Sequence, residues 1–227
     1  TERKIMEKDE LARRLSALNI LGVYYNAPED TKEQGRIWYN VAYNTMQAIA
    51  QKTCLPIATV ISAASALSPN NNWRKNVSDV DRLATAFVSG AEIDSIKVST
   101  YNPNKRKAWL LLQYWLTDKT DRQREILNGL KTTAFYDCIR YAGDPEYEQG
   151  RTAVCVDGHA KNIFYGERHS LSSNKSNIGK IEYHTIAEAY CTAALMINEV
   201  APAERPLSGC QVQAITWGHW RNLHGIK

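Results

Sequence analysis

Apolar residues recur at intervals of three and four over most of the chain, the spacing that brings them onto one face of an α-helix. Few segments alternate apolar and polar residues with the period of two that a half-buried strand shows. The sequence therefore predicts an all-α fold. The expected helices start near Asp9, at Asp30 or Thr31, after Pro56, ahead of Val77, at Asn102, around Leu130 and at Asp157, with two more near 184–198 and 209–223.

The N-terminal helices indicate which faces we expect to be buried. The first would be capped by Asp9 and would carry three leucines on one face, namely Leu11, Leu15 and Leu18. In the second, the residues in register are Trp38, Val41, Thr45 and Ile49. Apolar faces with this period normally pack against the rest of a globular chain.

The domain organisation is predicted to be simple, because the 227 residues contain no repeat period and no linker of distinct composition. Apolar residues make up 44% and charged residues 23%, which is typical of a globular protein. We expect one domain over 1–227, with N-terminal helices in 1–53 and a core in 54–223. Two polar segments interrupt that core, a loop at 143–152 and a surface insertion at 167–182.

Location and cofactors follow from what the chain lacks. No run approaches the roughly 18 apolar residues of a membrane-spanning helix, and the charged N-terminus has no apolar signal-peptide centre. The five cysteines are scattered and form no C-x-x-C pair, a pattern typical of reduced thiols. We expect a cytoplasmic protein without a metal centre or another cofactor, and we expect it to act as a monomer.

Positive charge is concentrated in two segments rather than spread over the chain. The net charge is 28 − 24 = +4, yet residues 97–140 alone contain nine basic and four acidic side chains. Residues 205–227 contain three basic side chains and no acidic one. Such segments suit a polyanion such as DNA, although a solvated surface explains the charge equally well.

The first motif that suggests chemistry is an asparagine-rich turn between two apolar helices. Asn70, Asn71 and Asn72 are followed by Arg74 and Lys75. Three asparagines can simply form a turn with a helix N-cap. Alternatively, a short amide can fill the space that a base leaves when it is extruded from a duplex.

The second motif is a tight turn that opens a new helix. It contains Asn128, Gly129, Lys131 and Thr132, and backbone amides at such a turn can bind a phosphate. A lysine at this place is usually a solvated surface residue. It gains a catalytic interpretation only if a carboxylate lies within reach.

The third motif, Val-Cys-Val-Asp-Gly-His, supplies that carboxylate at Asp157, two residues before His159. An aspartate after a short apolar run is usually just an N-cap. In a pocket, the same carboxylate can stabilise positive charge at a sugar C1′ and assist proton transfer. The fourth motif places Gln213 and Trp217 on one face of a helix, where they either pack in the core or bind a flipped base by its edge and its plane.

The order of these four motifs resembles that of the helix-hairpin-helix DNA glycosylase superfamily, and of its 8-oxoguanine DNA glycosylase branch in particular. The resemblance covers about residues 54–223 and implies a helix-hairpin-helix glycosylase-like helical fold. The hairpin here is L-N-G-L-K where the family has L-P-G-V-G-x-K, and 26 residues separate the lysine from the aspartate. The chain also looks like short proteins of bacterial viruses, some of which act on modified thymines of viral DNA.

The resemblance assigns a role to each motif residue. The catalytic pair would be Lys131, whose amine we expect burial to desolvate, and Asp157. The residues that hold the base would be Gln213, Trp217, Phe135 and His159, with Phe135 and Trp217 on its two faces. The DNA-contacting residues would be Asn70, Asn71, Asn72, Arg74, Lys75, Asn128, Gly129 and Thr132. An alkali ion is a further possible partner at the hairpin carbonyls.

The function that follows is that of a DNA glycosylase with AP-lyase activity, which binds double-stranded DNA, flips out a modified or damaged base and excises it. Two alternatives stay open. The same scaffold could carry a transferase that attaches a group to a hypermodified thymine. It could also be a DNA-binding module without catalytic activity.

Overall fold

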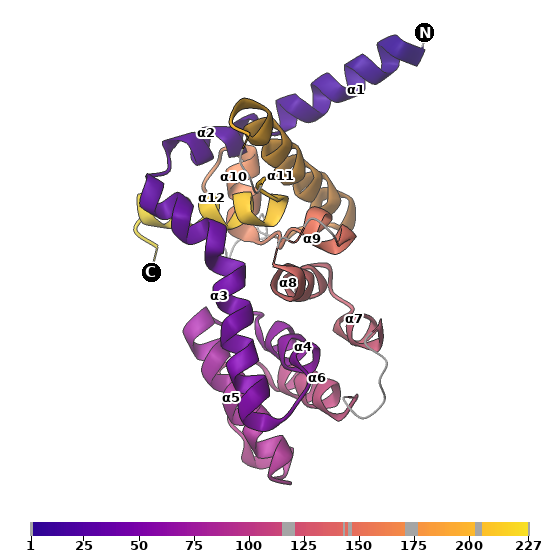
Figure 1. Ribbon diagram of the computed structural model, residues 1–227, viewed down its shortest axis with the longest axis vertical. Helices are drawn as coiled ribbons and strands as arrows, with labels where there is room; N and C mark the ends of the chain where they lie inside the picture. Colours follow the sequence, from indigo (N-terminus) through magenta and orange to yellow (C-terminus); the bar gives the residue numbers. More distant parts are fainter. Residues whose placement is uncertain are drawn as a thin grey trace. The chain divides into compact units, whose positions relative to one another are not determined.

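The structure is a computed structural model, and it describes residues 2–114, 121–142, 144, 147–170, 177–202 and 206–226 (Figure 1). Every regular element within these ranges is a helix, which confirms the predicted all-α class. Among the described helices, none combines the length and the apolar character that a membrane crossing requires.

The chain folds into two compact units, and each is described by itself. Unit 1 comprises Thr1–Tyr39 and Tyr141–Lys227, and unit 2 comprises Asn40–Arg140. The first boundary lies within one helix, α3 (Glu29–Thr53), and not at the position between residues 53 and 54 where we expected the core to begin.

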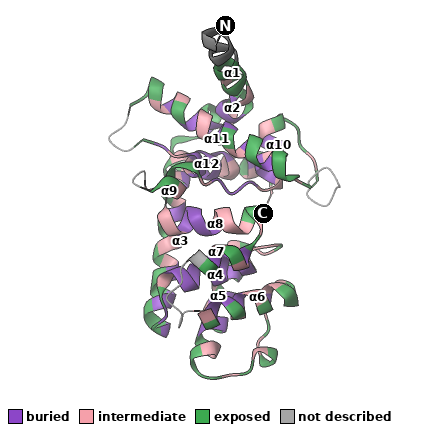
Figure 2. Ribbon diagram, turned by 90° about the vertical axis from the view of Figure 1, so that its right-hand side faces the viewer, coloured by how far each residue is buried: buried purple, intermediate pink, exposed green. Residues whose placement is uncertain are grey.

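Unit 2 is built around α4 (Ile57–Leu67), whose residues from Ala58 to Leu67 are all buried (Figure 2). A helix that is apolar on all sides needs neighbours on all sides. Those neighbours are α5 (Trp73–Val88), α6 (Asn102–Gln113) and α7 (Asp121–Leu127), with the short helix η1 (Ile93–Ser95) beside α5 and α8 (Leu130–Tyr141) after the turn that follows α7.

Unit 1 packs α2 (Leu18–Asn26), α10 (Gly158–Tyr165), α11 (Lys180–Val200) and α12 (Gly209–Leu223) against one another. The start of α3 comes so close to α12 that a Cβ atom on Gly35 would lie 2.5 Å from the Ile215 backbone. Only glycine fits such a contact without displacing a helix. α1 (Glu2–Ser16) packs on α11, and α9 (Glu148–Thr152) on α11 and α12.

The prediction for the first helix was wrong in two respects. Asp9 lies inside α1 and does not cap it, and Leu11, Leu15 and Leu18 are each more than half exposed. The physical reason is that α1 turns its charged side chains toward α11. Arg13 pairs with Glu188, and Arg14 with Glu199.

The predicted face of α3 was also wrong, by about one residue. The buried residues are Tyr39, Ala42 and Met46, whereas Val41 is half exposed. Ile49 is buried as expected, because it lies three residues after Met46 and shares its face of the helix.

The starts of the remaining helices largely follow the sequence. Those after Pro56, at Asn102 and after Asp157 are confirmed, as is the helix over 209–223. The loop predicted at 143–152 instead contains α9, and its residues 143, 145 and 146 lie outside the described ranges. The insertion predicted at 167–182 runs into α11, which begins at Lys180, and its residues 171–176 lie outside the described ranges.

Candidate functional site

The three asparagines of the first motif have three different environments. Asn72 caps α5, since its side chain accepts a hydrogen bond from the Lys75 amide at 2.9 Å, so the turn-and-cap interpretation holds for this residue. Asn71 points inward and donates to the Leu67 carbonyl. Asn70 is exposed, and its left-handed backbone (φ 53°) is a conformation that asparagine tolerates better than most residues. Asn70 and Asn72 are therefore both exposed, and of the two Asn72 is the one whose side-chain oxygen caps a helix.

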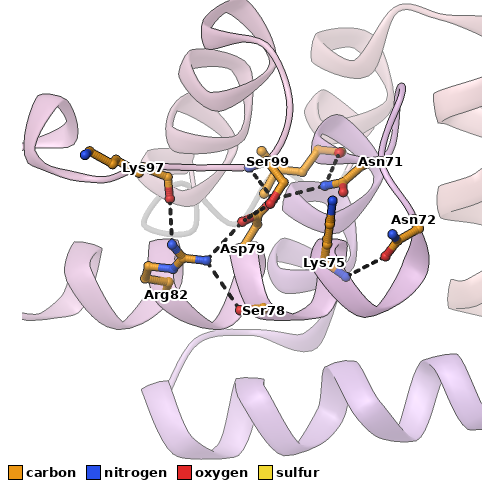
Figure 3. A network of polar contacts seen from close by, with 9 residues as sticks. Asn71, Asn72, Lys75, Ser78, Asp79, Arg82, Lys97 and Ser99 are labelled. Carbon is orange, nitrogen blue, oxygen red and sulfur yellow. Dashed lines mark hydrogen bonds and ion pairs between the residues drawn. The ribbon is translucent and has the colours of Figure 1, made fainter.

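A buried carboxylate holds this turn in shape (Figure 3). Asp79 on α5 is fully buried, and its Oδ2 accepts hydrogen bonds from the Ser99 amide at 2.8 Å and the Asn71 amide group at 3.0 Å. Its Oδ1 pairs with the Arg82 guanidinium at 3.2 Å. The Asp79 network thus ties the turn before α5 to the loop that leads into α6.

The same loop presents a residue that the sequence analysis missed, Tyr101. Its ring is 62% exposed, and its hydroxyl accepts a hydrogen bond from the Asn70 side chain at 3.3 Å. The Thr100 hydroxyl donates to the Pro69 carbonyl at 2.7 Å, which fastens the two loops beside this contact. We call Asn70 and Tyr101 the tip of unit 2. A signal was present, since an aromatic residue in a polar loop before a helix start is a candidate for binding.

The predicted basic positions lie next to the tip. Arg74 and Lys75 are both exposed on the first turn of α5. Between them and the tip, the ring of Trp73 meets the ring of Phe135 edge-on, with centroids 6.3 Å apart. This contact brings the first and second motifs together in unit 2.

The second motif forms the predicted helix–turn–helix, with α7 ending at Leu127 and α8 starting at Leu130. Asn128 takes the left-handed conformation (φ 51°) that reverses the chain. A Cβ atom on Gly129 would lie 2.8 Å from the hydroxyl oxygen of Thr132, which donates to the Gly129 carbonyl at 3.1 Å. Thr132 thus stabilises the turn from inside.

The carbonyl groups of this turn already have a cation beside them. The Leu127 carbonyl accepts a hydrogen bond from the Lys107 ammonium at 3.1 Å. An alkali ion at this carbonyl would have to compete with the Lys107 side chain.

Lys131 is the second residue of α8 and is exposed. The expectation that burial desolvates the Lys131 amine is therefore wrong, because this residue lies on the exposed side of the first turn of α8. Behind the turn, Asp137 on α8 pairs with Arg124 on α7 at 3.0 Å. Burial raises the pKa of Asp137 to about 6, although Arg124 acts to lower it.

In unit 1, the third motif holds its carboxylate with two donors. Asp157 caps α10, since Oδ1 accepts from the Ala160 amide at 2.8 Å. Its Oδ2 accepts from the indole nitrogen of Trp217 at 3.1 Å. The N-cap interpretation is therefore correct but incomplete. The residues before it, 154–156, are buried, and the Tyr183 hydroxyl accepts a hydrogen bond from the Val156 amide and donates one to the Val154 carbonyl.

The fourth motif meets the third through Trp217. The His159 ring lies edge-on to the indole at 6.4 Å, and the Arg221 guanidinium lies 4.4 Å from the indole centroid. One face of the indole therefore already carries a cation from its own helix.

Gln213 is buried, whereas an amide that reads the edge of a base would need to be accessible. It is 5% exposed, and its side-chain oxygen accepts a hydrogen bond from the Tyr39 hydroxyl at 3.0 Å. The fully buried Tyr190 donates to the Ala160 carbonyl beneath Asp157, and burial raises the pKa of its hydroxyl. Tyr39 and Tyr190 are two further residues that the motif analysis missed, because both lie outside the four motifs.

Each unit thus assembles two of the four motifs. Unit 2 holds the asparagine turn and the hairpin with Lys131 and Phe135, and unit 1 holds Asp157, His159, Gln213 and Trp217. The pairing of Lys131 with Asp157, and of Phe135 with Trp217 around a base, joins residues of different units and stays a prediction.

The chain belongs to the family of unknown function DUF7178, whose family model matches residues 2–224. A search of curated proteins finds no match. A search of solved structures finds none either.

Proposed function

We propose that this DUF7178 protein is a DNA glycosylase with AP-lyase activity, which extrudes a modified or damaged base from double-stranded DNA and excises it. The observation that carries the proposal is the contact between Trp217 and Asp157, 60 residues apart in the sequence. The glycosylase resemblance assigns these two side chains to one base-binding site, and the hydrogen bond between them supports that assignment.

Unit 2 supports the proposal on the side of DNA binding. The tip, the exposed Arg74 and Lys75 and the hairpin lie in one unit, within which the Trp73–Phe135 contact links the turn to α8. The Asn70 amide would fill the space of the extruded base, and the cations would neutralise phosphates on either side.

In the proposed reaction, the neutral amine of Lys131 attacks C1′ of the extruded nucleotide. A bond from nitrogen to C1′ forms while the bond from C1′ to the base breaks, and the base leaves with the electron pair and takes up a proton. The sugar ring then opens, O4′ gains a proton, and an imine links Lys131 to C1′. Asp157 stabilises the positive charge on the sugar while the bond to the base breaks.

A transferase that acts on a hypermodified thymine is the second candidate, and the exposure of Lys131 favours it. A lysine that attacks C1′ is normally activated by desolvation or by a neighbouring cation, and an exposed side chain lacks that burial. In that reaction a nucleophile with an N–H or O–H group would displace the activating substituent of the thymine, the carboxylate of Asp157 would accept the proton of the nucleophile, and the strand would stay intact. A non-catalytic DNA-binding module would use the surface of unit 2 alone.

We propose a cytoplasmic monomer in each case, consistent with the free thiol state of all five cysteines.

Borohydride trapping separates these functions. The wild-type protein should form a covalent adduct with a duplex that contains an abasic site, because borohydride reduces the imine. Lys131→Gln should abolish the adduct and keep duplex affinity, since the backbone amides of the hairpin remain. Asp157→Asn should bind at least as tightly and react roughly 100-fold more slowly.

The control is Lys107→Gln, a nearby lysine whose ammonium is committed to the Leu127 carbonyl and which should still form the adduct. An adduct that survives in Lys131→Gln would refute the assignment of the nucleophile. Intact strands with a heavier base would establish the transferase. Duplex binding that is unaffected by either substitution, with no product, would establish the binding module.

A further inference from the structure

A cleft of about 390 Å³ opens in unit 2 between η1 and the start of α6. Three of its lining side chains are cationic, Lys97, Lys105 and Arg106, and one is anionic, Asp94. The local excess is therefore two positive charges. None of the four motifs includes this cleft, although its three cations belong to the basic segment 97–140.

The cation at the base of the cleft is held in place by the backbone. Lys105 is 6% exposed, and its ammonium donates to the carbonyls of Ile93 at 3.1 Å and Ile96 at 2.9 Å. An ammonium has three N–H donors, so these two bonds leave one for a ligand. Burying a lysine is costly, and within the described residues the Lys105 ammonium bonds two carbonyls and forms no ion pair with a carboxylate.

The two cations at the rim are available to a ligand. Lys97 and Arg106 are exposed, and within the described residues neither forms an ion pair with a carboxylate. The wall that carries Lys97 is rigidly placed, because its carbonyl accepts a hydrogen bond from Arg82 at 3.0 Å, and Arg82 pairs with Asp79 (Figure 3). The same network that shapes the asparagine turn thus shapes this cleft.

We infer that the cleft binds a phosphate group of the DNA backbone, which deepens the proposed function and rests on it. The short distance between the cleft and the tip of unit 2 favours a phosphate of the DNA backbone over a free phosphate. Lys97 and Tyr101 are four residues apart, at most about 14 Å along an extended loop. With an axial rise of about 3.4 Å per base pair, a duplex that contacts the tip on the side of the cleft would offer phosphates to it within about four base pairs.

The test measures affinity for a random duplex over a series of salt concentrations, with Lys97→Ala/Arg106→Ala in the full chain. We expect affinity to fall about tenfold or more at low salt, and the slope of log affinity against log salt to shrink by about 1, since one phosphate contact is lost. Asp94→Asn should tighten binding two- to threefold. Thermal unfolding of each variant verifies that it is folded, and the exposed rim positions make that the expected result.

The matched control is Arg168→Ala/Lys180→Ala, which removes the same charge from exposed positions of unit 1 and should change affinity less than twofold. Equal losses in the two double variants would overturn the cleft assignment while leaving the proposed function standing. Tight binding of inorganic phosphate with unchanged duplex affinity in Lys97→Ala/Arg106→Ala would overturn the assignment to the DNA backbone. A wild-type protein that binds no duplex would overturn the proposed function itself.

Discussion

The two units differ in the polar groups that they bury. Among the described residues, unit 2 buries three charged side chains, Asp79, Lys105 and Asp137, whereas the buried polar side chains of unit 1 are an imidazole, two amides and a hydroxyl. A buried charge adds little net stability, since its desolvation offsets its interactions, but its removal exposes unsatisfied partners. Charges of this kind specify a geometry more than they stabilise a fold.

Each buried charge of unit 2 lies behind a different surface feature. Asp79 holds the asparagine turn, Lys105 lies at the base of the cleft, and Asp137 lies behind the hairpin. In unit 1 the corresponding group is Asp157, which is only half buried and is held by a helix N-terminus and one indole. Unit 2 therefore uses its buried charges to hold loops in shape, and unit 1 holds one half-buried carboxylate between a helix N-terminus and an indole.

The largest effect should come from Asp79→Ala. The loss of the carboxylate leaves the Ser99 amide and the Asn71 side chain without their acceptor, which we expect to lower the free energy of unfolding by roughly 3–5 kcal/mol. Urea unfolding measures this loss, and hydrogen exchange should show a less protected Ser99 amide. Asp81→Ala, two residues along α5, removes only an exposed pair with Lys52 and should cost less than about 1 kcal/mol. Equal losses would contradict the role of the Asp79 network.

The second effect is a pH dependence that arises from Asp137. Burial raises the pKa of Asp137 from 3.8 to about 6. Between about pH 4 and 6, the Asp137 carboxyl group is therefore protonated in the folded protein and ionised in the unfolded chain. The contribution of Asp137 to stability is thus present below that window and is lost as pH rises through it, by up to roughly 3 kcal/mol.

Asp137→Asn isolates this contribution, because the amide does not titrate. The difference in unfolding free energy between the variant and the wild type should shift in favour of the variant from pH 4 to 7. Arg124→Met, which removes the cation that opposes the pKa shift, should move the midpoint to higher pH. A difference that stays constant over this range would show that Asp137 does not titrate there.

The smallest effect is kinetic and concerns unit 1. Trp217→Phe keeps an aromatic ring for stacking but loses the N–H group that holds Asp157. A hydrogen bond to a charged group contributes about 1.5–3 kcal/mol, so we expect adduct formation to slow roughly tenfold or more while duplex affinity changes less than twofold. The decrease in the rate of adduct formation caused by Trp217→Phe should not add to the decrease caused by Asp157→Asn, since both substitutions act through one carboxylate.

Trp220→Phe on the same helix is the control, because the Trp220 indole nitrogen makes no hydrogen bond within the described residues. It should react at the wild-type rate. Wild-type reaction rates in Trp217→Phe would reduce the role of Trp217 to stacking.

Much of the helical framework could be predicted from the sequence, because helix ends depend on local chemistry. Pro56, Asn102 with Pro103, and Asp157 each mark a helix start in the structure as they do in the sequence. The turn around Gly129 is similar, since a residue without a side chain leaves room for the Thr132 hydroxyl. These effects act over a few residues and do not depend on the rest of the fold.

The candidate site was predictable in its residues and less so in their environments. Trp217 and Asp157 were both named from motifs, but the hydrogen bond between them depends on how α10 packs against α12. Tyr101 and Asp79 belong to no motif. Their importance comes from contacts with Asn70 and Ser99, which are distant in the sequence.

The sequence by itself determined the helical class, most helix starts and the residue types of the four motifs, because propensity, capping and turn geometry are local. The tertiary structure alone decided which faces are buried. The leucines of α1 have the period of a buried face, yet they are exposed because α11 offers carboxylates to the arginines on the other side. Periodicity predicts that a helix forms, but its rotation about its own axis depends on the neighbours that it packs against.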